Sequence, residues 1–325
     1  MTSSFRHTHR GRHVSICLAA GLALVGLTLV VFCNPAQATS AAVRGGQSVN
    51  SPSSSSPPAH PSARRPARKA AHSPAVPSRL AVKSKIALVE DANTSEVLLA
   101  KNADKITPIA SITKLMTAIV VLDAKLPLED VLTISNADRD QVMGTTSRLN
   151  VGWSLNRVDM LHLALMSSEN RAAAALSRYY PGGRPAFIAA MNARAAELGM
   201  SNTHFVNPNG LTSENVSTAF DLLKLVQAAY QYPLIREFST DRNYSVQIGR
   251  RILPYVNSNR LVGRPDWDID VQKTGFINDS GHCVVMRVNA DGRTLIMVFL
   301  DAIGKLTRFA DAQRVRTQLA LAQHK

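Results

Sequence analysis

Segments with strand character lie at both ends of the region 79–325, and helical segments fill its middle. Asp91–Ser95 and Asp291-Gly292 carry turn residues that join neighbouring strands into hairpins. The expected strands are 86–90 and 96–102 near the start, and 244–248, 271–273, 283–289 and 294–300 near the end. Because strands from opposite ends of the chain must share one sheet, we expect an α+β fold, with an antiparallel sheet built from both ends and a helical subdomain inserted between them.

Apolar residues at helical spacing mark the middle of the chain. The expected helices are 111–124, 157–166, 170–180, 187–198 and 219–230, with a further helix at 305–323 after the last strand. Phe187, Met191 and Ala195 share the face of one helix that we expect to be buried, and Gly199 ends that helix. Ser217 is the expected N-cap of the helix that follows.

The first 38 residues have the pattern of an export signal. Basic residues precede an uncharged apolar run, Val14–Phe32, and Ala36-Gln37-Ala38 then provides an A-x-A cleavage pattern. The apolar run is also long enough to span a bilayer, so 14–32 could instead remain as an uncleaved membrane anchor. Either reading places the rest of the chain in an exported, periplasmic or cell-envelope location.

Residues 39–78 are rich in Ser, Pro and Arg and have no apolar periodicity, so we expect a disordered linker. The chain carries a net charge of +14, yet no Asp or Glu occurs before Glu90. The excess of positive charge therefore belongs partly to the N-terminal tail. This placement argues against a nucleic-acid partner, which would require a basic patch on the folded region.

Cysteine usage excludes a disulfide framework and a cysteine-rich metal centre. The chain has three cysteines, and two of them, Cys17 and Cys33, precede the linker. No HExxH pair occurs among the nine histidines. We expect no metal and no organic cofactor. His282 and Cys283 are neighbours on an expected strand, so they should point to opposite faces rather than form a dyad.

The chemistry is carried by three short motifs, of which Ser111-Ile112-Thr113-Lys114 is the first. Its residues lie at an expected helix start, where positions three apart share one face. The Lys114 amine can therefore reach the Ser111 hydroxyl. Serine is inert near pH 7 unless a base removes its proton, and a lysine of lowered pKa can do so.

The other two motifs lie on either side of the expected helix 187–198. Ser168-Glu169-Asn170 interrupts two apolar helices, where Ser168 could relay a proton and Asn170 could hold a carbonyl and a lysine. We expect the Glu169 side chain to face solvent. Lys273-Thr274-Gly275 ends an expected strand, and Lys and Thr together suit a carboxylate-bearing substrate.

Taken together and in this order, the motifs resemble the S-x-x-K, S-D-N and K-T-G signature of serine β-lactamases and penicillin-binding proteins. The stretches ASITKLMTAIVVLDA, LHLALMSSENRAAAALSRYYPGG, AFIAAMNARAAELGM and HFVNPNGL are similar to S11 D-alanyl-D-alanine endopeptidases of the penicillin-binding protein 7 type. The resemblance covers 85–301. It implies a β-lactamase/transpeptidase-like fold for 79–325, with peptidoglycan stem peptides as substrates and β-lactams as covalent inhibitors.

The resemblance also implies a role for each motif residue. Ser111 would be the nucleophile and Lys114 its base, while Ser168 would pass a proton to the leaving amine and Asn170 would orient substrate and lysine. Substrate binding would involve Lys273, Thr274, Gly275 and Phe276. In this scheme Lys273 also lowers the pKa of Lys114, and the backbone N–H groups of Ser111 and Phe276 form an oxyanion hole.

Several functions remain open at this point. Only about 25 residues follow Leu300, whereas the usual S11 carboxypeptidases continue into a separate β domain, and this favours a DD-endopeptidase. The alternatives are a D-alanyl-D-alanine carboxypeptidase, a β-lactamase, or a catalytically silent peptidoglycan- or penicillin-binding module. No convincing deacylating base is found between Asn170 and Lys273, which argues against the β-lactamase.

Overall fold

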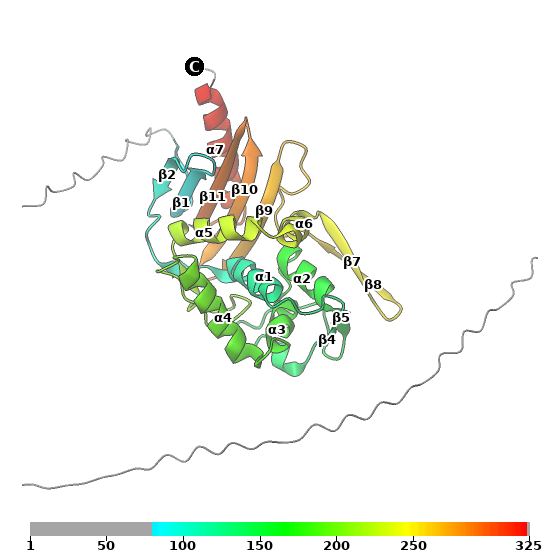
Figure 1. Cartoon of the computed structure of the whole chain (residues 1–325). Helices are drawn as coiled ribbons and strands as arrows, with labels where there is room; N and C mark the ends of the chain where they lie inside the picture. Colours follow the sequence, from blue (N-terminus) through cyan, green and yellow to red (C-terminus); the bar gives the residue numbers. More distant parts are fainter. Residues whose placement is uncertain (1–79, 324–325) are drawn as a thin grey trace, which may run out of the picture. The chain divides into compact units, whose positions relative to one another are not determined.

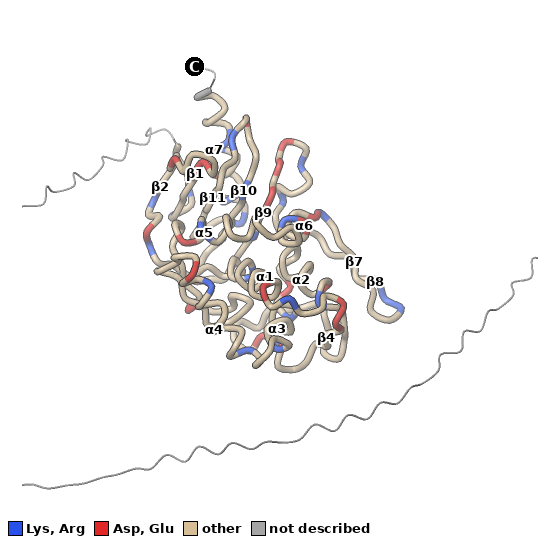
Figure 2. The backbone as a smooth tube through the Cα atoms, in the orientation of Figure 1, with Lys and Arg blue, Asp and Glu red and all other residues tan. Residues whose placement is uncertain are grey.

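A computed structural model describes residues 80–323. The predicted export signal or anchor (1–38, with its apolar run 14–32) and the predicted linker (39–78) lie outside these residues. No helix within the described range is both long and apolar enough to cross a bilayer. Among the described residues, Lys and Arg are interspersed with Asp and Glu along the backbone in the view of Figure 2.

A five-stranded sheet forms the centre of the fold (Figure 1). Its strands are β1 (Ile86–Asp91), β2 (Val97–Lys101), β9 (Asp268–Ile277), β10 (Gly281–Ala290) and β11 (Arg293–Ala302). They lie in the order β2-β1-β11-β10-β9, and every neighbouring pair is antiparallel. Ile86 on β1 pairs with Leu300 on β11, so strands from the two ends of the chain meet at the middle of the sheet. The predicted α+β fold is confirmed.

The two faces of the sheet are covered differently, as strand alternation allows. On one face, Ala87, Val284, Met297 and other apolar side chains pack against α7 (Thr307–Gln323). On the other face, residues such as Val285 join the larger core of the helical subdomain. Figure 1 shows α7 and α5 on opposite sides of the sheet.

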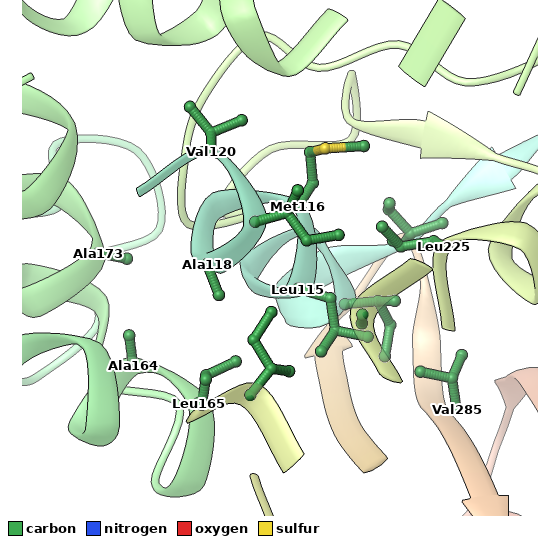
Figure 3. Close-up of a cluster of buried hydrophobic side chains, with 14 of the residues drawn as sticks. Leu115, Met116, Ala118, Val120, Ala164, Leu165, Ala173, Leu225 and Val285 are labelled. Carbon is green, nitrogen blue, oxygen red and sulfur yellow. The ribbon is translucent and has the colours of Figure 1, made fainter. Parts of the chain in front are cut away.

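The helical subdomain surrounds one buried helix. Its helices are η1 (Ala110–Ile112), α1 (Thr113–Asp123), α2 (Arg157–Met166), α3 (Asn170–Arg178), α4 (Gly183–Glu197), α5 (Ala219–Tyr230) and α6 (Pro233–Thr240). Leu115 and Met116 of α1 lie among Leu165 of α2, Leu225 of α5 and Val285 of β10 (Figure 3). The helix that carries the first motif is thereby fixed on several sides.

Short elements complete the described fold. They are η2 (Asn136–Asp138) and three two-stranded ribbons, β3 (Thr107–Pro108) with β6 (Val216–Ser217), β4 (Val131–Thr133) with β5 (Ser154–Asn156), and β7 (Asn243–Ile248) with β8 (Arg251–Val256). The β7–β8 hairpin extends away from the sheet (Figure 1). Its tip carries the exposed residues Arg250 and Arg251.

The structure differs from the predicted elements in a few places. Thr218, not Ser217, caps α5, because its side chain accepts a hydrogen bond from the Asp221 N–H while Ser217 pairs in β6. The sequence analysis missed the short elements β3, β4, η2, β5 and β6, and it also missed α6 and β8. Helix α6 is only eight residues long, and Pro254 and exposed arginines weaken the strand pattern of β8.

Candidate active site

The first motif forms the turn that leads into α1. Ser111 lies in η1 with 8% of its surface exposed, and the preceding Ala110 has the positive φ of 46°. Lys114 lies one turn further on and is fully buried. Apolar packing of α1 on both sides therefore draws an amine out of water and places it beside a nearly buried hydroxyl.

Three oxygen atoms surround the Lys114 amine. Its Nζ lies 2.7 Å from each of Ser111 Oγ, Asn170 Oδ1 and the backbone carbonyl oxygen of Asn209. The last two atoms only accept hydrogen bonds. A neutral amine that donates its two hydrogens to them has its lone pair left for the Ser111 hydroxyl. The geometry suits transfer of the serine proton to Lys114.

The charge state of Lys114 agrees with this geometry. Burial lowers the pKa of Lys114 from 10.5 to about 7, and the Glu169 carboxylate acts in the opposite direction. A shift of this size corresponds to roughly 5 kcal/mol against the charged form. Near pH 7 a large fraction of the molecules therefore holds a neutral Lys114 that can accept a proton.

The second motif lies at the junction of α2 and α3. Asn170 is the first residue of α3; its Oδ1 faces Lys114, and its Nδ2 donates to Thr145 Oγ1 at 3.2 Å. Ser168 adopts a left-handed backbone conformation with φ 64°, a costly one for a residue with a Cβ. Its hydroxyl has no hydrogen-bond partner within residues 80–323.

Contrary to the prediction, the Glu169 side chain does not face solvent. It caps α3 by accepting the Arg171 N–H at 3.2 Å, and its Oε1 also accepts the Ser147 hydroxyl at 2.7 Å. These contacts leave only 8% of Glu169 exposed. The carboxylate is held behind Asn170, and its charge reaches Lys114.

The third motif lies on β9, the edge strand of the sheet. Lys273 is fully buried, and its Nζ donates to the Thr274 carbonyl at 2.9 Å. The Thr274 hydroxyl contacts Ser258 Oγ at 2.7 Å. Burial, and then repulsion from Lys114 and Arg308, lowers the pKa of Lys273 well below its usual value. The main cause of the lowered pKa of Lys114 is its own burial, rather than the predicted repulsion by Lys273.

Two glycines allow backbone segments to approach Ser111. A Cβ on Gly275 would lie 2.9 Å from the Ile109 carbonyl oxygen and 3.2 Å from the Ser111 nitrogen. A Cβ on Gly210, where φ is +79°, would lie 2.0 Å from the Ala110 carbonyl oxygen. The chain around Ser111 is therefore held between β9 and the 207–210 loop.

Phe276, the last of the predicted site residues, is on β9 directly after Gly275. The residue is 51% exposed, and its ring stacks on that of His282, with ring centroids 4.2 Å apart. Cys283, the next residue on β10, is fully buried, and burial raises the pKa of its thiol to about 11. Within residues 80–323 no three His, Cys, Asp or Glu side chains gather closely enough to hold a metal ion.

Asn209 and Gly210 lie in the family-like stretch HFVNPNGL, and the structure brings this turn against Lys114 and Ser111. Asn215 holds the turn in place, since its amide nitrogen donates to the Asn207 carbonyl and to Thr113 Oγ1. Sequence reasoning missed other residues of the site. Thr145, Ser147 and Ser258 come from loops without a motif. Arg308 is nearly buried at the start of α7, and its positive charge contributes to the lowered pKa of Lys273.

Comparisons with known proteins agree with this geometry. Residues 69–304 match the family model Peptidase_S11, described as D-alanyl-D-alanine carboxypeptidase. The chain is 51% identical to a D-alanyl-D-alanine endopeptidase of Pseudomonas aeruginosa over 239 residues, which cover 73% of this chain and 77% of the relative. It is also 51% identical to the enzyme of that name from Escherichia coli K12 over 233 residues, covering 71% and 75% of the two chains.

Solved structures of penicillin-binding proteins and DD-transpeptidases share this fold. The Streptomyces K15 DD-transpeptidase superposes with a TM-score of 0.67 at 28% identity, covering 72% of this chain and 96% of the other. Penicillin-binding protein D2 from Listeria monocytogenes, solved in a cefotaxime-bound form, superposes with a TM-score of 0.64 at 29% identity and the same coverage. With its three motifs assembled on this fold, the chain belongs to the S11 family of D-alanyl-D-alanine peptidases.

Proposed function

We propose that this S11 peptidase hydrolyses D-Ala-containing cross-links of peptidoglycan through an acyl-enzyme on Ser111. The single observation that carries the proposal is the 2.7 Å contact between Ser111 Oγ and the buried amine of Lys114, whose pKa is about 7. The names of the 51%-identical relatives favour a DD-endopeptidase over a carboxypeptidase.

In the proposed mechanism, Lys114 takes the proton of Ser111 as its oxygen attacks the D-Ala carbonyl carbon. The backbone N–H groups of Ser111 and Phe276 stabilise the resulting oxyanion. The proton then passes from Lys114 through the Ser168 hydroxyl to the leaving amine. Asn170 orients both substrate and lysine. Water finally hydrolyses the ester, with Lys114 again acting as the base.

The strand side of the site is proposed to recognise a carboxylate. Arg308 supplies positive charge, the buried Lys273 supplies an amine that can hold a proton beside an anion, and Thr274 supplies a hydroxyl at the edge of the sheet. Gly275 lets this strand lie against the nucleophile. A carboxylate on the leaving group would pair with this charge and place the scissile carbonyl at Ser111. β-Lactams carry a carboxylate beside a reactive carbonyl, so we propose that they acylate Ser111.

We further propose that the enzyme works in the cell envelope. Residues 1–38 would direct export, or 14–32 would anchor the chain, and 39–78 would tether the peptidase region (79–325) as a linker. Stem peptides would reach the site from the surrounding peptidoglycan. Neither a nucleic acid nor a metal or organic cofactor enters the proposed reaction.

Mass spectrometry of two muropeptides tests the proposal. The full-length enzyme and its Ser111→Ala variant are incubated with a cross-linked dimer and with a pentapeptide monomer. Conversion of dimer to monomers, lost in the variant, supports the DD-endopeptidase. Removal of one D-Ala from the pentapeptide alone makes the enzyme a carboxypeptidase, and no turnover of either substrate favours the silent binding module.

A further inference from the structure

The β7–β8 hairpin and the loop after it carry charge of one sign. Residues 242–265 have no Asp or Glu but contain five arginines, Arg242, Arg250, Arg251, Arg260 and Arg264. Arg250 and Arg251 are exposed at the tip of the hairpin, which is blue in Figure 2. Within residues 80–323 neither of these two side chains forms an ion pair with a carboxylate. The tip therefore offers its positive charge to a partner outside the described residues.

The two faces of the hairpin differ in exposure. Val246 and Tyr255 lie on one face and are buried in the core of the helical subdomain. Alternation along β8 turns Ile252 and Val256 to the other face, where they are 69% and 68% exposed. Two neighbouring apolar side chains with so much exposed surface mark a contact surface. The basic tip thus continues into an apolar face.

The base of the hairpin lies at the rim of the candidate active site. Ser258, two residues after β8, has its hydroxyl oxygen 2.7 Å from that of Thr274 in the third motif. Arg148 donates a hydrogen bond to the Pro254 carbonyl at 2.5 Å, and it comes from the loop that contacts the second motif. A substrate bound between these motifs therefore enters beside the hairpin.

The tip is set apart from this rim by the length of β8. At a rise of about 3.4 Å per residue, Arg251 lies roughly 17 Å along the strand from Val256. In the proposed function, the stem peptide in the site belongs to a polymer whose glycan strand carries further stem peptides on either side. Each of them has free carboxylates and aliphatic side chains. Arginine side chains pair with carboxylates, and an exposed apolar face covers aliphatic groups.

We propose that the β7–β8 hairpin is a docking surface for polymeric peptidoglycan. Arg250 and Arg251 bind carboxylates of stem peptides next to the one being cleaved, while Ile252 and Val256 contact their aliphatic parts. The inference rests on the proposed function, which supplies the polymer. Exposed ion pairs are individually weak and are screened by salt, so this docking depends on ionic strength. It holds the enzyme on the polymer and leaves the chemistry at Ser111 unchanged.

Binding to purified sacculi separates docking from cleavage. The full-length Ser111→Ala protein lacks the proposed nucleophile, so the polymer stays intact while co-sedimentation measures the bound fraction. Adding Arg250→Glu and Arg251→Glu should raise the apparent Kd about tenfold at low salt, through slower association. High salt should remove most of this difference. The matched control, Lys105→Glu with Lys125→Glu, reverses two exposed charges outside the hairpin and should bind sacculi like the parent protein.

Two further measurements test the parts of the proposal separately. Ile252→Ala should raise the apparent Kd for sacculi about threefold, and salt should not change that ratio, because the lost contact is apolar. In the active enzyme, the double reversal at Arg250 and Arg251 should slow the release of fragments from sacculi about tenfold. The same enzyme should keep kcat/KM for a soluble muropeptide, and penicillin labelling checks that its active site is folded.

Unchanged sacculus binding after the reversal at Arg250 and Arg251, or an equal loss in the lysine control, would overturn the docking surface. A matching loss of kcat/KM on the soluble muropeptide would also overturn it, by placing the hairpin in the substrate site. If the reversal abolishes binding to phosphatidylglycerol vesicles but not to sacculi, the charge serves a membrane instead. Failure of the proposed function is distinguishable, because the wild-type enzyme then cleaves no muropeptide, whereas sacculus binding is measured without cleavage.

Discussion

Two walls of the site each contain a fully buried lysine, but the two lysines differ in their hydrogen-bond partners. The helical wall consists of η1, α1, the start of α3 and the 207–210 loop, and it gives Lys114 three oxygen partners at 2.7 Å. The strand wall consists of β9 and the first turn of α7. Within the described residues, Lys273 there donates only to the Thr274 carbonyl, and Arg308 Nε has no partner.

The difference shows how one site can use the same side chain for two tasks. Oxygen acceptors on the helical wall fix the direction of the Lys114 amine, so its lone pair can face the Ser111 hydroxyl. Within the described residues, the strand wall brings two basic groups, Lys273 and Arg308, together without a carboxylate to balance them. Buried charge of one sign is costly, and an anionic substrate reduces that cost on binding. This difference agrees with the proposed roles, in which the helical wall transfers the proton and the strand wall recognises the substrate.

The largest expected effect comes from removing the base on the helical wall. Lys114→Met keeps the volume of the side chain but removes the amine, so penicillin acylation should slow by about 10²–10⁴-fold. Stopped-flow labelling measures this rate. The melting temperature is measured alongside and should not fall much, since a costly buried amine is lost. Acylation within tenfold of wild type would show that Lys114 is not the base.

Removal of the lysine on the strand wall should have the next largest effect. Lys273→Met removes the amine that would hold a proton against the bound carboxylate, and we expect kcat/KM to fall roughly a hundredfold, as for truncation of one partner of a buried charge pair. The same variant should acylate normally with a carboxylate-free ester substrate if the wall serves recognition alone. An equal loss with both substrates would assign Lys273 to proton transfer instead.

Substitution of Gly210 and Gly275 tests how tightly each wall packs against the chain around Ser111, and the measured quantity is the free energy of unfolding. In Gly210→Ala the new Cβ meets the Ala110 backbone at 2.0 Å and the residue keeps a positive φ, so the loop of the helical wall must move. We expect a loss of about 2–4 kcal/mol in unfolding free energy, as for overpacking combined with backbone strain. Gly275→Ala meets its nearest atom at 2.9 Å and should cost about half as much. Urea denaturation measures both, and the reverse order would contradict the geometry.

The smallest expected effect is a shift in pH dependence. Penicillin acylation should rise as the pH increases through about 7, because deprotonation of Lys114 creates the base. The Glu169 carboxylate raises the pKa of Lys114. In Glu169→Gln, the pH at which the acylation rate rises should therefore be lower by about half a unit, a modest change for one neighbouring charge.

A matched control is available for the pH experiment. Glu129→Gln removes an exposed carboxylate from the loop after α1 and should leave the pH profile in place. If the acylation rate of Glu169→Gln rises at the same pH as that of the wild type, the Glu169 carboxylate does not influence the pKa of Lys114. The pH profile also distinguishes an electrostatic effect of Glu169 from a structural one. Loss of the Ser147 contact alone would lower the acylation rate without changing the pH at which it rises.

The sequence analysis predicted the motif residues and the sheet better than it predicted their surroundings. Ser111 and Lys114 are three apart on one helix, so local geometry alone brought them together, and the Asp291-Gly292 turn fixed one hairpin. Asn209 reaches Lys114 from 95 positions away along the chain, and no local pattern encodes such a contact. The prediction that the Glu169 side chain faces solvent was wrong, because its burial depends on a contact with Ser147, in a loop that no motif marks.

The pairing of β1 with β11 has a consequence for how the protein is made. The sheet cannot close until its last strands exist, because the central pair joins residues more than two hundred positions apart. Closing so long a loop is entropically costly and delays folding. Ser111 is synthesised early, but it meets Gly275 only after β9 has been made and has docked. A partly made chain therefore contains Ser111 without the strand that completes the site, and the proposed cleavage of cell-wall peptides must wait for the whole peptidase region.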